Sequence, residues 1–392
     1  MIKRVIFLIH YPLRLRDYQR LGVDLLNENG FQVEIWNLTS LIMPFDTQEY
    51  DPIDLFYYEG EIIFYDKRDV RIKLSRLSEE DIVICTMRYS YDRFWLYRAL
   101  GRTKAKYAIE SNNLVPTKRE IKSLDKLPKI FNTYRVSKLC KMLISKFILN
   151  RIPLQHLGIK PADFILGGGE KSVITNNAIN KGTDVLWAHA TDYDRYLEER
   201  DTEVKEKPVA VFLDQFLPFH PHGVLAKSPK PFDAERYYAL LNNFFNIVEE
   251  QTGLEVIIAS HPRSNYEHHP EYFDGRRCIK EETVKLIRMC RFAMAHHSTV
   301  LNFANLVFKP VIFLTYSDLD NAYDGATIRE FAKWFGKRPI AIDKEINIDW
   351  AAELEINANQ YDYYRNAYIK TDFSEDLPFW QIVANRLKSG NS

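Results

Sequence analysis

Two short polar clusters, each directly after an apolar run, contain residue types suited to binding an anion. The first occupies residues 260–263 (Ser-His-Pro-Arg) and the second occupies residues 296–299 (His-His-Ser-Thr). Imidazole and guanidinium groups donate hydrogen bonds to phosphate or carboxylate oxygens. Hydroxyl side chains and free backbone N–H groups at the start of a helix bind the same groups. The side chains that we predict to hold a nucleotide-linked phosphate are His261, Arg263, His297, Ser298 and Thr299.

The apolar runs around these clusters predict the elements that position them. Residues 255–259 and 291–295 are short and apolar, as is typical of strands buried on both faces. Ser298 is a suitable N-cap for a helix over 299–306, and residues 311–314 predict the next strand. In an open α/β sheet, ligands bind beyond the carboxyl ends of the strands, so both clusters are expected at one edge.

Two further residues are predicted to lie near this edge. Gln215 stands in the loop after the apolar run 209–213, and Glu282 stands at the start of a helix predicted over 281–290. We list Gln215 as a candidate contact of the donor or the acceptor. A different interpretation of the clusters is a helix cap beside histidines that satisfy backbone groups.

The amino half repeats the alternation of strands and helices. A helix is predicted over 18–29, closed by Gly30, and the predicted strands are 5–9, 31–36, 81–86, 106–109, 162–166 and 183–187. No G-x-G-x-x-G follows the first strand, so the usual dinucleotide fingerprint is absent. We predict an α/β protein with two Rossmann-like domains, 1–200 and 208–360, facing each other across a cleft. A helical segment at 361–392 is expected to pack back on the first domain.

Three residues at predicted strand ends of the amino half are candidates for a general base. Glu110 follows the run 106–109, while His189 and Asp192 follow the run 183–187. A carboxylate or imidazole at such a position takes a proton from a substrate hydroxyl. Structural roles remain open: Glu110 as a loop cap or a lysine partner, and Asp192 as a helix N-cap.

The composition limits the classes of binding partner that we expect. Lysine plus arginine equals aspartate plus glutamate at 53 each, so no global footprint for nucleic acid exists. The stretch 117–151 is strongly basic with apolar residues at helical spacing, which predicts contact with the inner-membrane surface or a core helix with a basic back. No apolar run approaches a membrane span, and the four cysteines show no metal or disulfide spacing. We expect a cytoplasmic protein, peripheral on the cytoplasmic membrane, without a bound metal or cofactor.

The motif His261-Pro262, followed by Ser298-Thr299, an apolar helix and Lys-Pro-Val-Ile-Phe at 309–313, resembles the carboxyl-terminal domain of GT-B glycosyltransferases. Among these, it is most similar to bacterial sialyltransferases, polysialyltransferases and capsule Kdo transferases. The resemblance implies that these motifs hold the phosphate and ribose of a CMP-linked acidic sugar. It also implies that Glu282, at the start of its helix, contacts the cytosine or the ribose. It also implies metal-independent, inverting transfer to a surface polysaccharide or lipid-linked glycan. It covers the carboxyl half, and the amino half only as architecture.

Three other functions fit the same sequence. Teichoic-acid glycerophosphotransferases, which use CDP-glycerol, share a similar pair of motifs. A sugar-nucleotide epimerase has the same predicted fold and converts its donor without an acceptor. A non-catalytic nucleotide-sugar-binding partner of another transferase would bind the ligand without turnover.

Overall fold

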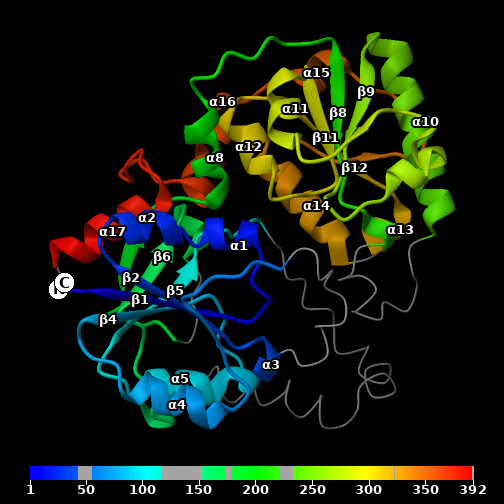
Figure 1. The fold of residues 1–392 in the computed structure, drawn as a ribbon. Coiled ribbons are helices and arrows are strands. Elements are labelled where there is room, and N and C mark those ends of the chain that lie inside the picture. Colours follow the sequence, from blue (N-terminus) through cyan, green and yellow to red (C-terminus); the bar gives the residue numbers. More distant parts are fainter. Residues whose placement is uncertain are drawn as a thin grey trace. The chain divides into compact units, whose positions relative to one another are not determined.

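A computed structural model of the chain describes residues 1–42, 55–116, 152, 154–173, 178–219, 233–321 and 323–390. The chain divides into two compact units (Figure 1). Unit 1 comprises Met1–Leu114, Ile121–Asp194 and Lys370–Ser392, and unit 2 comprises Val115–Glu120 and Arg195–Ile369. The helical segment expected at 361–392 is therefore divided between the two units. Each unit is built on its own parallel sheet.

The sheet of unit 1 has seven strands in the order β3-β2-β1-β4-β5-β6-β7. Its strands are β1 (Arg4–Ile9), β2 (Gln32–Asn37), β3 (Glu61–Ile63), β4 (Asp81–Cys85), β5 (Lys106–Ser111), β6 (Phe164–Gly167) and β7 (Asp184–Trp187). All neighbouring pairs are parallel, with Phe7 of β1 opposite Ile35 of β2 and Ile84 of β4. The strand order reverses between β1 and β4, which is where ligands bind in doubly wound sheets.

Helices cover both faces of this sheet (Figure 1). The helices of unit 1 are α1 (Leu15–Arg20), α2 (Val23–Glu28), α3 (Thr39–Ile42), α4 (Lys67–Ser75), α5 (Phe94–Leu100) and α17 (Phe379–Ser389), with α8 (Thr191–Glu199) running from unit 1 into unit 2. The core between the sheet and α2 and α17 contains Phe7 and Trp380, and the core under α4 and α5 contains Val83 and Tyr97. Apolar residues therefore face both ways along the central strands, as expected of buried parallel strands.

The single helix predicted over 18–29 is wrong, because the chain forms α1 and α2 with a break at Gly22. Gly22 adopts φ 58°, in the left-handed region that favours glycine. The ring of Trp380, from α17, occupies the space where a side chain at Gly22 would lie. Trp380 also donates from Nε1 to the carbonyl oxygen of Arg20 at 2.6 Å and packs edge-on against Phe7 at 5.0 Å. The break thus provides the docking place of the C-terminal helix.

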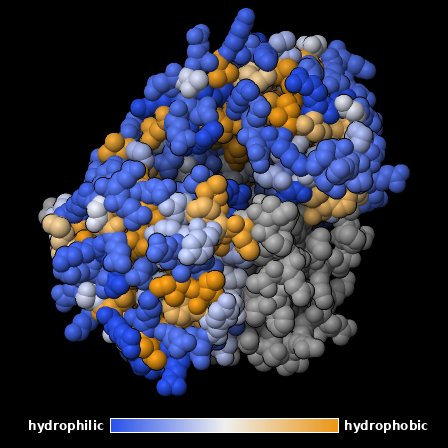
Figure 2. Space-filling model, viewed as in Figure 1, coloured by the Kyte–Doolittle hydropathy of each residue, from blue (hydrophilic) through white to orange (hydrophobic). Residues whose placement is uncertain are grey.

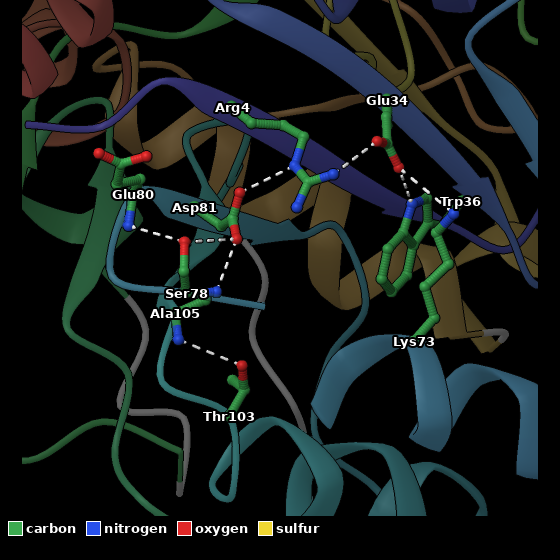
Figure 3. A network of polar contacts seen from close by, with 9 residues as sticks. All are labelled: Arg4, Glu34, Trp36, Lys73, Ser78, Glu80, Asp81, Thr103 and Ala105. Atoms are coloured by element: carbon green, nitrogen blue, oxygen red, sulfur yellow. Dashed lines mark hydrogen bonds and ion pairs between the residues drawn. The ribbon is translucent and has the colours of Figure 1, made fainter. Parts of the chain in front are cut away.

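Arg4 connects three strands near their amino ends (Figure 3). This edge of the sheet is opposite to the carboxyl edge, where ligands bind in such sheets. Its Nε donates to Asp81 Oδ1 of β4 at 2.8 Å, and its Nη1 donates to Glu34 Oε1 of β2 at 2.9 Å. Glu34 also accepts from Trp36 Nε1 at 2.8 Å, and Asp81 accepts from the backbone N–H of Ser78 at 2.7 Å. Burial by itself would raise the pKa of Asp81, but the hydrogen bonds from Arg4 and Ser78 lower it below its ordinary value.

The sheet of unit 2 has six parallel strands in the order β10-β9-β8-β11-β12-β13. These are β8 (Val209–Leu213), β9 (Glu255–Ala259), β10 (Cys278–Ile279), β11 (Phe292–Ala295), β12 (Val311–Thr315) and β13 (Ile340–Ala341). The order again reverses once, between β8 and β11. The predicted strands at 209–213, 255–259, 291–295 and 311–314 are confirmed within one residue.

Seven α-helices of the described chain lie wholly within unit 2 and surround its sheet. They are α10 (Ala234–Thr252), α11 (Thr283–Met289), α12 (Leu301–Leu306), α13 (Ser317–Asn321), α14 (Tyr323–Trp334), α15 (Trp350–Leu354) and α16 (Ala358–Tyr364), the last continuing as a π-helix over Arg365–Ile369. The longest, α10, begins at Asp233, whose side chain accepts from Arg236 N, and ends at Gly253 in the left-handed region. None of the described helices is long and apolar enough to cross a bilayer.

Candidate functional site

The loops after the two strands that flank the reversal point of unit 2 contact each other through one residue each. Gln215 follows β8 and His297 follows β11. The backbone N–H of His297 donates to Gln215 Oε1 at 3.1 Å, and Gln215 Nε2 lies 3.3 Å from His297 Nδ1. Both predicted residues therefore meet at the position where doubly wound sheets bind ligands.

These contacts set the orientation of both side chains. The oxygen of Gln215 must face the backbone N–H, so its amide nitrogen faces Nδ1 of His297 and donates to it. A neutral His297 ring then carries its proton on Nε2, which makes Nε2 a hydrogen-bond donor. The ring also stacks near Phe331, with centroids 6.3 Å apart. A half-buried donor of fixed orientation is suited to a phosphate oxygen.

Asp214 holds the His261 loop against this position. Its Oδ2 accepts from the backbone N–H of His261 at 3.2 Å and from the hydroxyl of Tyr266 at 2.9 Å. Its Oδ1 accepts from the backbone N–H of Phe216 at 2.9 Å. Burial raises the pKa of Asp214, and the hydrogen bonds from these groups oppose that rise. One buried carboxyl therefore connects the loop after β8 to the loop after β9.

His261 is oriented by its own loop. Its Nδ1 accepts from the backbone N–H of Arg263 at 3.2 Å, and its ring stacks on Phe216 with centroids 6.3 Å apart and planes 11° apart. The proton of a neutral ring then lies on Nε2, as in His297. Pro262 and Arg263 are exposed. In their neutral forms, His261 and His297 thus carry the proton on the same nitrogen, in the loops after β9 and β11, and β8 lies between these two strands.

The helix predicted over 299–306 begins later than expected, because residues 298–300 form a turn. The helix α12 begins at Leu301 with Val300 at its N-cap, and no side chain caps it. Ser298 Oγ instead accepts from the backbone N–H of Val300 at 3.3 Å, one turn earlier, and Thr299 is exposed. The hydroxyls therefore remain beside His297, on a turn and not on the first residues of the helix.

Two other residues near the motifs, His296 and Glu282, form contacts within the protein. His296 is fully buried, with Nδ1 at 2.8 Å from the carbonyl of Leu314 and Nε2 at 3.1 Å from the Tyr237 hydroxyl. It fastens β11 to its neighbours. Glu282 lies at the N-cap of α11, is exposed, and forms an ion pair of 2.7 Å with Lys285.

In unit 1, Glu110 lies on β5, the second strand beyond the reversal point. Burial raises the pKa of Glu110, and the charge of Arg20 opposes the rise. Burial and the charge of Glu110 both raise the pKa of Tyr11, which follows β1. The neighbouring ring of His10 lies 5.5 Å from that of Tyr11. A carboxyl of raised pKa thus lies near a phenol at the carboxyl edge of the sheet.

The other two candidates for the base have different surroundings. His189 is fully buried, with Nδ1 at 3.0 Å from the carbonyl of Ala190 and Nε2 at 2.8 Å from the carbonyl of Leu377. Neither nitrogen offers a lone pair to a substrate, and the ring fixes the C-terminal segment to β7. These surroundings favour a structural role, and a catalytic His189 stays a prediction. Asp192 lies half-buried in the first turn of α8.

Sequence reasoning missed Asp214 and Tyr266 as members of the site. An acidic residue directly after the apolar run 209–213 is a recognisable sign, because such residues lie at the ligand edge of a sheet. The partnership with Tyr266 joins residues 52 positions apart and has no local sign. The predicted membrane stretch 117–151 lies outside the described residues. Within the described chain, no group of three or more metal-ligating side chains occurs.

Comparison with known proteins gives a likeness in fold. No protein-family model and no curated protein matches the sequence. A variant of the wall teichoic acid polymerase TagF matches at a TM-score of 0.50 and 9% identity, over 99% of this chain and 88% of that chain. The UDP-GlcNAc 2-epimerase from Methanocaldococcus jannaschii matches at 0.47 and 12% identity, over 100% of both chains. With two doubly wound sheets, the chain is an α/β protein of two Rossmann-like domains, the GT-B fold.

Proposed function

We propose that the protein is a GT-B glycosyltransferase that moves a sugar from a nucleotide-activated donor to a glycan or lipid-linked acceptor. The observation that carries the proposal is the contact of Gln215 with His297 at the strand reversal of unit 2. Beside it, Asp214 holds the loop of His261. The arrangement supports two imidazole donors for a phosphate.

The leaving nucleotide phosphate would be held by His261, His297 and the hydroxyls of Ser298 and Thr299. Hydrogen-bond donors that are already oriented stabilise charge that develops on a leaving group. The proposal therefore needs no metal ion. The exposed Arg263 would add a charged donor to the same phosphate, and the exposed Glu282 is assigned to the nucleoside end of the donor. Our preferred donor is a CMP-linked acidic sugar, which rests on the resemblance of the His-Pro and Ser-Thr motifs.

Glu110 of unit 1 is the proposed general base. Its carboxylate would take the proton of the acceptor hydroxyl while the hydroxyl oxygen forms a bond to the anomeric carbon. The bond from that carbon to the donor phosphate oxygen would break, and the electron pair would leave with the nucleotide. A single displacement of this kind inverts the anomeric centre. A raised pKa makes Glu110 a stronger base than an ordinary glutamate once it is ionised.

The test is a thermal-shift panel of CMP, CDP, UMP, UDP, GDP and ADP with the wild type and His297→Ala. A ligand that binds only the folded state raises the melting temperature by mass action. We expect stabilisation by CMP that the variant loses, while His156→Ala, an exposed histidine of unit 1, retains it. Stabilisation by UDP or GDP in place of CMP would overturn the donor assignment, and the absence of any shift would overturn the site.

Turnover then separates the rival activities. Cleavage of the stabilising donor only when a glycan acceptor is added supports the transferase. Conversion of the donor without any acceptor would indicate an epimerase. Transfer from CDP-glycerol would indicate a glycerophosphotransferase, and binding without turnover would indicate a non-catalytic partner.

A further inference from the structure

The helices α4 and α5 form a basic surface on unit 1. They contact one another on the same side of the sheet (Figure 1), and their outer side chains include many cations. Figure 2 shows this region, at the bottom of unit 1, as mostly hydrophilic with apolar residues among them. We call it the α4–α5 face, and its exposed cations are Lys67, Arg68, Arg71, Arg76, Arg98, Arg102 and Lys104.

The cations of the α4–α5 face outnumber the carboxylates of α4 and its cap. Among the described residues, none of the cations of this face forms an ion pair, and the acidic side chains on α4 and its cap are Asp66 and Asp69. Unit 2 provides a contrast, since Arg276 pairs with Glu249 at 2.7 Å and Lys309 pairs with Glu206 at 2.9 Å. In a chain of zero net charge, this face concentrates positive charge.

An apolar side chain stands in the middle of the cations. Val70 and Leu74 of α4 point into the core. Arg68, Ile72 and Arg76 follow one another at intervals of four residues, so they form a stripe on the opposite, solvent side of the helix. Ile72 is 39% exposed, and Tyr65, just before the helix, is 76% exposed. Exposure of an apolar side chain to water is unfavourable, and a partner that covered it would remove this free-energy cost.

A hollow lies next to this stripe. It has a volume of about 340 Å³, and its lining combines three apolar side chains with three cations and one carboxylate: Phe64, Ile72, Leu77, Arg4, Lys73, Arg76 and Asp69. Lys73 already lies 3.8 Å from Glu34, whereas Arg76 has no ion pair within the described chain. A phosphate group that entered this hollow would meet the guanidinium of Arg76 beside an apolar wall, and cations outnumber the single carboxylate, Asp69, in the lining.

We propose that the α4–α5 face docks on an anionic lipid bilayer, with Tyr65 and Ile72 entering the headgroup layer. Cations near an anionic membrane each add to binding, and apolar or aromatic side chains between them enter the boundary with the acyl chains. A nucleic acid would satisfy the cations but would give Ile72 no apolar surroundings. The docking holds whether or not the protein transfers a sugar, and it is separate from the basic stretch 117–151.

The test measures how the full chain sediments with vesicles of phosphatidylcholine alone and of phosphatidylcholine mixed with phosphatidylglycerol. We expect binding to the mixed vesicles that weakens as salt rises. The triple variant Arg68→Glu, Arg76→Glu, Arg102→Glu should lower the partition coefficient at least about a hundredfold. The matched control is Lys333→Glu, Arg338→Glu, Lys344→Glu, which reverses three exposed cations of unit 2 and should leave binding unchanged.

A second variant separates a bilayer from other polyanions. Tyr65→Ser with Ile72→Ser should weaken binding to the mixed vesicles several-fold without changing the affinity for a single-stranded RNA. The proposal is overturned if the triple variant binds the vesicles as the wild type does. It is also overturned if the serine variant binds both ligands as the wild type does, or if its binding to both is weakened equally. A third contradicting outcome is that RNA displaces the protein from the vesicles at equal phosphate concentration. Unchanged melting temperatures of all variants would show that the losses are not due to unfolding.

Discussion

Gln215 and His297 form a two-point contact between the loops that follow β8 and β11, with distances of 3.1 and 3.3 Å. Because the amide orients the imidazole, Gln215→Met should leave His297 in place but free its ring to turn. We predict that the variant loses most of the melting-temperature increase that the stabilising nucleotide produces, while its unliganded melting temperature changes little. Gln19→Met, at an exposed position of unit 1, is the control. An unaltered nucleotide response in Gln215→Met would contradict the assigned role of the contact.

Asp214 should matter for stability as well as for the site. Its two oxygens accept three hydrogen bonds, from Phe216, His261 and Tyr266. Asp214→Asn places an amide NH₂ against at least one of these donors, so we expect a loss of about 1–3 kcal/mol in the free energy of unfolding. Tyr266→Phe removes only one of the three bonds and should cost about 1 kcal/mol. Urea unfolding of both variants measures the difference, and a smaller loss for Asp214→Asn than for Tyr266→Phe would contradict this account.

Glu110→Gln tests the proposed base. The amide keeps the shape of the side chain but cannot accept the proton, so turnover of the identified donor and acceptor should fall about a hundredfold to ten-thousandfold. Nucleotide binding, which we assign to unit 2, should stay intact. Glu61→Gln is a matched control, because burial also raises the pKa of Glu61, and it lies on the edge strand β3, away from the strand reversal. Equal rates for the wild type and Glu110→Gln would remove Glu110 from the mechanism.

The strands and the motif edge were predictable because their signals are local. Apolar runs such as 209–213 and 255–259 are typical of buried strands at this length, and the polar residues after them then lie at one edge. The break at Gly22 was not predictable, since the helical pattern over 18–29 continues through it. Its cause is Trp380, more than 350 positions away, whose ring excludes any side chain there.

The chemistry of single residues was less predictable than their position. His189 and His297 both follow a strand, yet one is enclosed by two carbonyls and the other receives a hydrogen bond from Gln215. The difference arises from Leu377 in the C-terminal segment and from the loop after β8. Strand ends therefore located the candidates, and tertiary partners determine the surroundings of each side chain.

His10 should make the protein sensitive to acid. Its Nδ1 is buried with no hydrogen-bond partner among the described residues. Burial and the charge of Arg93 lower the pKa of His10 from 6.5 to about 4. Between these values the unfolded chain binds a proton that the folded chain does not, so stability falls as the pH drops through this window. As the pH falls through this window, we expect the free energy of unfolding of the wild type to drop by up to about 3 kcal/mol more than that of His10→Gln.

Urea unfolding of the wild type and His10→Gln, at neutral pH and near pH 4, checks this linkage. The exposed His156 is the control position, and His156→Gln should follow the wild type at both pH values. A wild type and a His10→Gln variant that lose equal stability on acidification would show that another group causes the loss.

Alanine substitutions at Gly22 and Gly30 distinguish two contributions to stability: the conformational cost at a positive φ and the loss of the packing of the C-terminal helix. Both adopt positive φ, 58° and 86°, so an alanine at either position carries a conformational cost of about 1 kcal/mol. At Gly30 no atom lies within 4 Å of the added methyl group, whereas at Gly22 the methyl group would overlap the ring of Trp380. Gly22→Ala should therefore lose clearly more stability than Gly30→Ala, because Trp380 must leave Phe7 and the carbonyl of Arg20. Proteolysis should then release the segment after residue 370 in Gly22→Ala alone, and equal melting temperatures for the two variants would show that α17 does not depend on the break between α1 and α2.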